Sequence, residues 1–318
     1  MISKTRALYR NLTIILISLV SLNVAVGFYK SFSKIKNFNS SSISFTVQDK
    51  SVLNYFSNKS TVDYISQAEE MIDIFNKYDF SVESFLNDQS SNLIIFSSWP
   101  KDFLNISSVN KRKKLFINTL LPIIFVENRK ILEDRKKILD WWNQSDGESF
   151  SREFWPGWLF ELSEKYNYNE SSLGNLLIRV DIVPLSLVLS QAAIESGWGT
   201  SRYLDEGNAI FGQYTFDPKS GIKPKERANN KKFFIKKFAN LSDSVRSYLK
   251  NINTHNAYES FRQERRKLRM NGETLQGNVL ADHLQKYSER SNEYVKDIKH
   301  IIQTNNFMKF DKANGLLN

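Results

Sequence analysis

The sequence "LSLVLSQAAI" at residues 185–194 is apolar on nearly every side of a helix, and it constrains the fold more than any other stretch. A helix that is hydrophobic all round has to be buried by neighbouring elements. Pro184 suits the first turn of such a helix, and Gly197 is a natural stop after it. The chain has 318 residues, 41% of them hydrophobic, which is enough to build the surrounding core.

Amphipathic helices are predicted before this central element. Residues 108–144 carry apolar side chains at helical spacing and should form one or two long helices, broken or kinked near Pro122. A shorter helix is expected at residues 158–169, and Asn169 or Ser171 should cap the helix that follows.

The pattern after the central element is helical again, apart from one short β region. "GNAIFGQYTF" at 207–216 reads as a loop or short strand, and "KKFFIKKF" at 231–238 reads as one half of a hairpin. Ser242 should cap an amphipathic helix, and further helices are expected around 257–269 and 274–305. The predicted class is mainly α with a small β hairpin lobe.

An uncharged apolar stretch at residues 12–29 follows Lys4, Arg6 and Arg10. This pattern is typical of a secretory signal or a signal anchor, and its length is at the lower limit for a membrane-spanning helix. Phe28 and Tyr29 favour an uncleaved anchor in the inner membrane over a cleaved signal, and a buried core helix is the remaining alternative. Either export reading places the rest of the chain on the periplasmic side of a bacterial cell envelope.

The predicted organisation has three parts. Residues 1–30 form the signal anchor or signal peptide, and residues 31–97 form a linker rich in Ser, Asn and Lys followed by a weakly specified helical region. Residues 98–310 form the main domain, whose catalytic core is expected at about 165–305.

Composition excludes several classes of function. There is no cysteine, and the three histidines form no close cluster, so we expect no thiol nucleophile, no metal site and no cofactor. The net charge is +10, and four cations without an acidic residue lie in residues 1–30, which leaves about +6 for the rest. That excess suits an anionic polymer such as the cell wall, an anionic membrane surface, or simply a solvated basic face. No nucleic-acid-binding motif is present, and nothing assigns an oligomeric state.

Glu195 ends the apolar run as an isolated carboxylate. The exposed carbonyl groups at the end of a helix disfavour a neighbouring anion, and apolar surroundings disfavour the ionised form, so both effects should raise its pKa. A carboxyl group that stays protonated near neutral pH can donate its proton to a leaving oxygen, as the general acid of a glycosidase does. The alternative is an ordinary surface residue, or a buried carboxylate paired with an arginine.

The residues around Glu195 resemble the signature of glycoside hydrolase family 73, and "SQAAIESGWGTSRYLDEGNAIFGQY" carries most of the match. The segments "LLPIIFVENRKILEDRKKIL", "SDSVRSYLKNINTHNAYESFR" and "YSERSNEYVKDIKHIIQTN" resemble its Bax-type branch, so the likeness covers roughly residues 98–305. The matching signature residues are Gln191, Ala192, Ala193, Glu195, Ser196, Gly197, Trp198, Gly199, Ser201, Asn208, Phe211 and Gly212.

This resemblance implies a lysozyme-like α+β domain with a catalytic helix and a flexible β lobe. It implies hydrolysis of the β-1,4 bond that follows N-acetylglucosamine in peptidoglycan, with Glu195 as the general acid. A second carboxylate would activate water, and Asp205, Glu206, Asp217 and Glu226 are the candidates; Glu226 precedes the strand-like run where relatives carry such a group.

The resemblance also implies roles for several other side chains. Tyr287 matches an aromatic position near the family's active site and could orient water or the substrate's acetamido group, whereas Tyr294 is expected to be structural. The residues predicted to bind substrate, each of which packing could also explain, are Trp198, Asn208, Gln213 and Tyr214.

Two other functions remain open at this point. A lytic transglycosylase also uses one glutamate in a lysozyme-like fold and needs no water-activating base. A wall-binding protein without turnover would keep the groove, and Glu195 would then be dispensable.

Overall fold

The computed structural model describes residues 60–62, 67–87, 93–145, 151–225 and 232–313. All of them fall within one unit of the chain, residues 54–318. The predicted signal or anchor at 12–29 lies outside the described residues. None of the helices in the described part is both long and apolar enough to cross a membrane.

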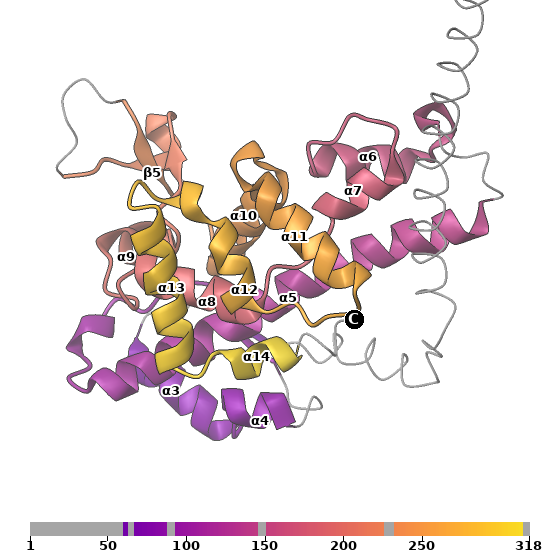
Figure 1. Ribbon diagram of the computed structural model, residues 1–318. Coiled ribbons are helices and arrows are strands. Elements are labelled where there is room, and N and C mark those ends of the chain that lie inside the picture. Colours follow the sequence, from indigo (N-terminus) through magenta and orange to yellow (C-terminus); the bar gives the residue numbers. More distant parts are fainter. Residues whose placement is uncertain (1–59, 63–66, 88–92, 146–150, 226–231, 314–318) are drawn as a thin grey trace, which may run out of the picture. The chain divides into compact units, whose positions relative to one another are not determined.

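The described elements confirm the mainly α class (Figure 1). The helices are α3 (Ala68–Lys77), α4 (Val82–Asn87), α5 (Val109–Gln144), α6 (Gly157–Lys165), α7 (Leu173–Arg179), α8 (Leu185–Glu195), α9 (Arg202–Gly207), α10 (Leu241–Thr254), α11 (Glu259–Met270), α12 (Gly277–Leu280), α13 (Asn292–Thr304) and α14 (Met308–Ala313). The strands are β1 (Ser60–Val62), β2 (Ile94–Phe96), β3 (Tyr214–Thr215), β4 (Gly221–Ile222) and β5 (Phe234–Lys236).

Helix α8 is the predicted central helix. Every residue from Leu185 to Ala193 is buried, so the helix has no solvent-facing side along that length. It contacts α5, α12, α13 and α14, which surround it in Figure 1. The sequence prediction is therefore confirmed, because a helix that is apolar on most sides has to be covered by neighbouring elements.

The N-terminus of α8 is capped by a residue from the other end of the chain. Pro184 is the N-cap rather than part of the first turn, and it provides no capping side chain. Instead, the carboxylate of Asp311 in α14 accepts hydrogen bonds from the Ser186 amide (3.0 Å), the Ser186 hydroxyl (2.6 Å) and the Gly277 amide (2.8 Å). Burial raises the pKa of Asp311 to about 6.

The segment leading into α8 is fixed by a buried ion cluster. Arg269 donates two hydrogen bonds to the Asp181 carboxylate, at 2.9 and 2.8 Å. Arg265 is itself fully buried and donates to the backbone carbonyls of Asp181 and Ile182. The three nearby arginines, the third of which is Arg135, hold the pKa of Asp181 well below its usual range although burial alone would raise it. The entry to the central helix is therefore held by charge pairing as well as by packing.

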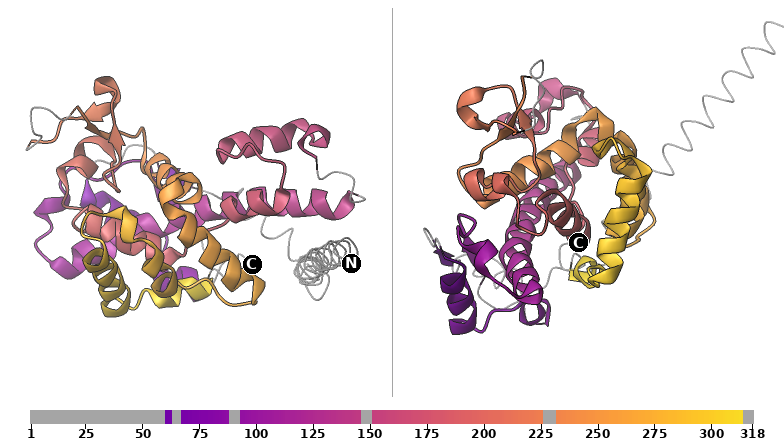
Figure 2. Two further views of the ribbon diagram at one scale, coloured as in Figure 1. Left: turned by 45° about the horizontal axis from the view of Figure 1, so that its top comes forward. Right: turned by 90° about the vertical axis from the view of Figure 1, so that its left-hand side faces the viewer.

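Helix α5 runs through Pro122 without a break, so of the predicted one or two helices the single helix is confirmed and the alternative of a break at the proline is wrong. The residues around the proline, from Leu120 to Asn128, are all buried, and their packing offsets the hydrogen bond that the proline cannot donate. Helix α6 lies alongside the C-terminal half of α5 (Figure 2), where Lys165 forms an ion pair with Asp134 at 2.6 Å.

Three details of the predicted helices need correction. Ser172, not Asn169 or Ser171, caps α7 by accepting from the Asn175 amide. Asn240, not Ser242, caps α10. The single helix expected at 274–305 is divided into α12, two 3₁₀ turns and α13, because the backbone is extended at Ser288 and left-handed at Ser291. Several polar side chains near a helix start could serve as its cap, so the pattern alone does not choose among them.

The predicted hairpin is a three-stranded antiparallel sheet in the order β3-β5-β4. Ile235 of β5 is opposite Tyr214 on one side and Ile222 on the other. Strand β4 has only two residues, so its pattern is too short to be predicted from the sequence. The turn sequence "ANN" lies outside the described residues.

Part of the stretch predicted as linker and weakly specified helix contributes to the core. Helices α3 and α4 form there, and Phe75, Phe80 and Phe85 are buried in the same hydrophobic cluster as α8. Strand β2 pairs in parallel with β1 and is also buried. The predicted boundary at residue 97 therefore does not coincide with a break in the core.

Replacing Asp311 by alanine should destabilise the fold, because the two buried donors of Ser186 at the start of α8 and the Gly277 amide at the start of α12 would lose their acceptor. We expect a loss of about 3 kcal/mol in the free energy of unfolding, measured by urea denaturation. The matched control is Asp297→Ala, which removes an exposed ion pair with Arg290 and should cost less than about 1 kcal/mol. Equal losses in the two variants would contradict the capping role of Asp311.

Candidate active site

Glu195 is the last residue of α8 and is only partly exposed. Burial raises the pKa of its carboxyl, and a hydrogen bond from Tyr294 acts in the opposite direction with a smaller effect. No charged group is among the causes of this shift. The prediction of a carboxyl whose pKa is raised by its apolar surroundings is thus consistent with the structure.

A tight reversal follows Glu195 and accounts for much of the "ESGWG" motif. Gly197, Trp198 and Gly199 have φ angles of +54°, +57° and +88°, a left-handed region that glycine adopts with little strain. A side chain at Gly199 would place its Cβ 2.3 Å from the ring of Trp99. The Ser196 hydroxyl donates to the Ala192 carbonyl and accepts from the Gly199 amide, which closes the turn. These residues present the carboxyl of Glu195 at a fixed helix end.

A chain of three hydrogen bonds ends on Glu195. The Tyr248 hydroxyl donates to Gln191 Oε1 at 2.5 Å, and Gln191 Nε2 donates to the Tyr294 hydroxyl at 3.0 Å. The Tyr294 hydroxyl in turn donates to Glu195 Oε1 at 2.7 Å. Gln191 and Glu195 lie one helical turn apart on α8, whereas Tyr248 belongs to α10 and Tyr294 to α13.

The direction of this hydrogen-bond relay follows from the donors available. The Gln191 amide can only donate through nitrogen and accept through oxygen, and in the structure its oxygen faces Tyr248 and its nitrogen faces Tyr294. The Tyr294 oxygen accepts from Gln191, and its own hydrogen is directed at Glu195. Oε1 of Glu195 is therefore an acceptor, and Oε2 is the oxygen that carries the proton when the carboxyl is neutral.

Four tyrosines surround the carboxyl. Tyr287 stacks on Tyr294 with ring centroids 5.4 Å apart and an interplanar angle of 4°, and it also contacts Tyr248 and Tyr258. Burial raises the pKa of all four hydroxyls, and the negative charge of Glu195 raises each one further. The site is therefore an aromatic, weakly hydrated environment around one carboxyl.

Of the two tyrosines in the C-terminal segment, Tyr287 was expected near Glu195, but Tyr294 is the one that contacts it. Tyr294, predicted to be structural, is the residue that contacts Glu195. Tyr287, predicted to be catalytic, reaches the site through stacking on Tyr294. Tyr294 lies on the buried face of α13, and a buried tyrosine hydroxyl usually has a partner, which is the signal that could have identified it.

Trp198 packs against other aromatic rings. Its ring lies 5.5 Å from that of Phe116 and 6.2 Å from that of Phe307. The ammonium group of Lys113 lies 4.4 Å from the ring centroid. The ring is partly buried and packs against the core beside α5, and its role in substrate binding stays a prediction.

The other predicted substrate-binding residues divide into two groups. Asn208 has its side chain held by backbone groups, accepting from the Trp99 amide and donating to the Phe238 carbonyl, so these contacts account for it structurally. Gln213 donates weakly to the Ser247 carbonyl, and its buried Oε1 has no hydrogen-bond partner among the described residues. Tyr214 is 66% exposed on the β lobe.

Three of the four candidates for the second carboxylate interact with other residues, and the fourth lies outside the described residues. Asp205 pairs with Lys101 at 3.1 Å, and Glu206 pairs with Arg202 at 3.3 Å. Asp217 accepts from the Lys219 amide at 3.0 Å. Glu226 lies outside the described residues, so its role stays a prediction.

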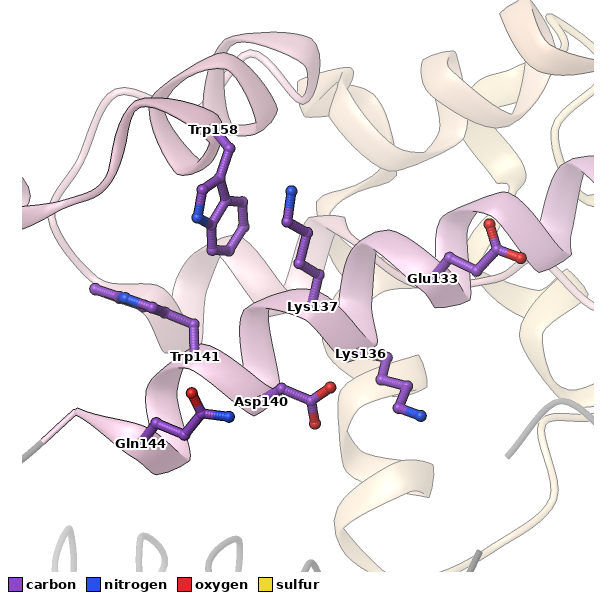
Figure 3. Close-up of a pocket in the computed structure, with 7 residues that line it drawn as sticks. All are labelled: Glu133, Lys136, Lys137, Asp140, Trp141, Gln144 and Trp158. Atoms are coloured by element: carbon purple, nitrogen blue, oxygen red, sulfur yellow. The ribbon is translucent and has the colours of Figure 1, made fainter. Parts of the chain in front are cut away.

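A pocket of about 360 Å³ lies elsewhere, on α5 and α6 (Figure 3). It is lined by Trp141 and Trp158 together with charged residues of α5, and it includes no residue of the Glu195 relay. The ammonium group of Lys137 already covers the Trp158 ring, 4.3 Å from its centroid. We therefore do not assign the substrate to this pocket.

Comparison with known proteins identifies the family. Residues 172–307 match the family model described as mannosyl-glycoprotein endo-beta-N-acetylglucosaminidase. The chain is also similar to the protein bax of Escherichia coli (strain K12), with 31% identity over 216 residues that span 65% of this chain and 74% of that protein. The chain belongs to the Bax-type glucosaminidase family. No solved structure matches it.

The family match includes the whole Glu195 relay. Residues 172–307 begin at the cap of α7 and extend past α13, so Gln191, Glu195, Tyr248 and Tyr294 all lie within them. Family membership points to a glycosidase-type enzyme that acts on a glycan.

Replacing Tyr294 by phenylalanine should destabilise the protein by about 1–3 kcal/mol, because Gln191 Nε2 and Glu195 would both lose a partner. The loss should grow with pH. Without the phenol the pKa of Glu195 is raised further above its unfolded value, so the penalty for ionising it increases from about pH 4 to about pH 8. Denaturation at both pH values measures this.

Tyr287→Phe is the matched control, because no described contact uses the Tyr287 hydroxyl and the stacked ring remains. We expect a change below about 0.5 kcal/mol that is independent of pH. If the two variants lost the same stability, or if the loss in Tyr294→Phe did not depend on pH, the relay to Glu195 would be contradicted.

Proposed function

We propose that this protein is a peptidoglycan hydrolase in which Glu195 is the general acid that cleaves the β-1,4 bond following N-acetylglucosamine. One hydrogen bond carries the proposal. The Tyr294 hydroxyl donates to Oε1 of Glu195, and burial raises the pKa of that carboxyl. This arrangement favours a protonated Oε2, which can deliver its proton to a glycosidic oxygen.

In the proposed step the proton moves from Glu195 Oε2 to the leaving oxygen while the bond from that oxygen to the anomeric carbon breaks. Glu195 becomes an anion at that moment. The Tyr294 hydroxyl remains hydrogen-bonded to Oε1, and a hydrogen bond to a charged acceptor is stronger than one to a neutral acceptor. The relay therefore stabilises the carboxylate that the reaction produces.

The second half of the reaction requires either a base for water or help from the substrate's acetamido group. An inverting enzyme places its two carboxyls roughly 6.5–9.5 Å apart with water between them. Glu226 is our proposal for such a base, and Tyr287 is our proposal for a residue that orients water or the acetamido group.

A lytic transglycosylase is the second candidate, and one observation favours it. Among the described residues, no carboxylate is hydrogen-bonded to Glu195 or contributes to its pKa. A transglycosylase requires no water-activating base, because a hydroxyl of the substrate closes an anhydro ring instead. The two activities differ in the end that they leave on the glycan.

We also propose that the protein acts on the periplasmic side of the envelope, held in the inner membrane by residues 12–29. The support is the charge pattern of those residues in the sequence. The peptidoglycan glycan strand is the partner that this location would supply.

Digestion of purified peptidoglycan, with products reduced by borohydride and identified by mass spectrometry, tests the function. We expect reduced N-acetylglucosamine ends from the wild type and at least about a thousandfold slower release from Glu195→Gln, on the scale of losing a general acid. The matched control is Glu293→Gln, which removes an exposed carboxylate paired with Lys296 and should leave the rate unchanged.

Other products would lead to other assignments. Anhydromuramic ends would show the transglycosylase reaction. If the wild type and Glu195→Gln both bound the glycan and released nothing, the protein would be a wall-binding protein without turnover, and the proposed hydrolase function would be wrong.

A further inference from the structure

The β lobe, defined here as residues 213–225 and 232–238, is strongly basic. Its residues include one acidic side chain, Asp217, and six lysines. The lysines are Lys219, Lys223, Lys225, Lys232, Lys236 and Lys237. Such an excess of positive over negative charge on a small sheet creates a positive potential that attracts an anionic partner.

This positive charge is not neutralised within the described part of the protein. None of the six lysines forms an ion pair there, whereas exposed lysines on other elements do, such as Lys267 with Glu264 and Lys296 with Glu293. The one acidic group of the lobe accepts hydrogen bonds from its own loop. The β lobe therefore presents a net positive surface to solvent.

The same lobe exposes aromatic side chains. Phe216 is 79% exposed and Tyr214 is 66% exposed, and both rank among the most exposed large apolar residues of the described chain. Tyr214 rests on Phe233, with ring centroids 4.5 Å apart. Exposed aromatic groups next to unneutralised cations are typical of a binding surface rather than of a structural one.

The β lobe is connected directly to the active site. Phe211, which precedes it, stacks on the relay residue Tyr248 with centroids 4.0 Å apart. Gln213 contacts the Ser247 carbonyl beside that tyrosine, and its Oε1 is a buried acceptor without a partner among the residues described. A polymer bound at Glu195 would therefore have the lobe next to it.

We infer that the β lobe binds the carboxylate-bearing peptide stems of peptidoglycan, so that the protein acts on peptide-substituted strands in preference to bare glycan. This inference rests on the proposed function. A bare glycan would offer sugar faces to the aromatic residues and one lactyl carboxylate per muramic acid, close to the sugar chain, whereas a peptide stem carries several carboxylates and holds them away from the sugars, where the lysines of the lobe could reach them. A strand with peptide stems offers both the sugar faces and these carboxylates, and it carries them on the same polymer that Glu195 would cleave.

Binding by the full-length Glu195→Gln protein tests the inference without turnover. We would measure cosedimentation in detergent with insoluble peptidoglycan, and retention on glycan strands from which an amidase has removed the peptides. The test variant is Lys219→Gln/Lys223→Gln/Lys225→Gln. The matched control, Lys165→Gln/Lys267→Gln/Lys296→Gln, removes the same charge from exposed, ion-paired positions elsewhere.

We expect the lobe variant to bind intact peptidoglycan about tenfold more weakly than the control, with the difference reduced at high salt. On the peptide-free strands, which keep one lactyl carboxylate per muramic acid, the lobe variant should lose much less binding than it does on intact peptidoglycan. Equal losses in the lobe variant and the control, or the same loss on intact and peptide-free material, would overturn the inference. So would a loss that appeared only on vesicles containing phosphatidylglycerol, which would make the lobe a membrane-binding surface.

The failure of the proposed function would look different. In that case the lobe variant would still lose peptidoglycan binding, but the wild type would release no glycan ends from the same material.

Discussion

The hydrogen bond from Tyr294 to Glu195 is the interaction on which the site depends. It decides which oxygen of the carboxyl accepts and which can carry a proton. Its direction follows from the Gln191 amide, whose nitrogen donates to Tyr294 and whose oxygen accepts from Tyr248. The rest of the relay therefore orients the phenol of Tyr294. The members of the relay come from helices α8, α10 and α13, which meet at this point.

The fold holds the helix that carries Glu195 at both ends. Asp311, from the last described helix, caps its first turn, and the ion cluster around Asp181 fixes the segment that enters it. At the other end, left-handed residues at Gly197 and Gly199 turn the chain away at once. Because Leu185 to Ala193 are buried on all sides, the helix can hardly shift, and the carboxyl remains beside the four tyrosines.

The sequence predicted those parts of the site that depend on local pattern. The burial of α8 followed from its lack of a polar face, and the raised pKa of Glu195 followed from its place at the end of that helix. The partner of Glu195 could not be predicted in this way, because Tyr294 lies 99 positions further along the chain and only packing brings the two residues together. The sequence favours Tyr287 because it matches an aromatic position near the active site of the family. The extended residue Ser288 and the left-handed Ser291, which separate it from α13, leave no clear trace in the periodicity.

A carboxyl that is buried, unpaired with any described cation and hydrogen-bonded by a single phenol should ionise late. The most direct test is an NMR titration of Glu195 in the wild-type protein with ¹³C-labelled glutamate, assigned by comparison with Glu195→Gln. The account predicts a pKa clearly above the ordinary value of about 4.3 for a glutamate side chain. Ionisation at or below that value would contradict it, because Glu195 would then be an anion at neutral pH with no proton to donate.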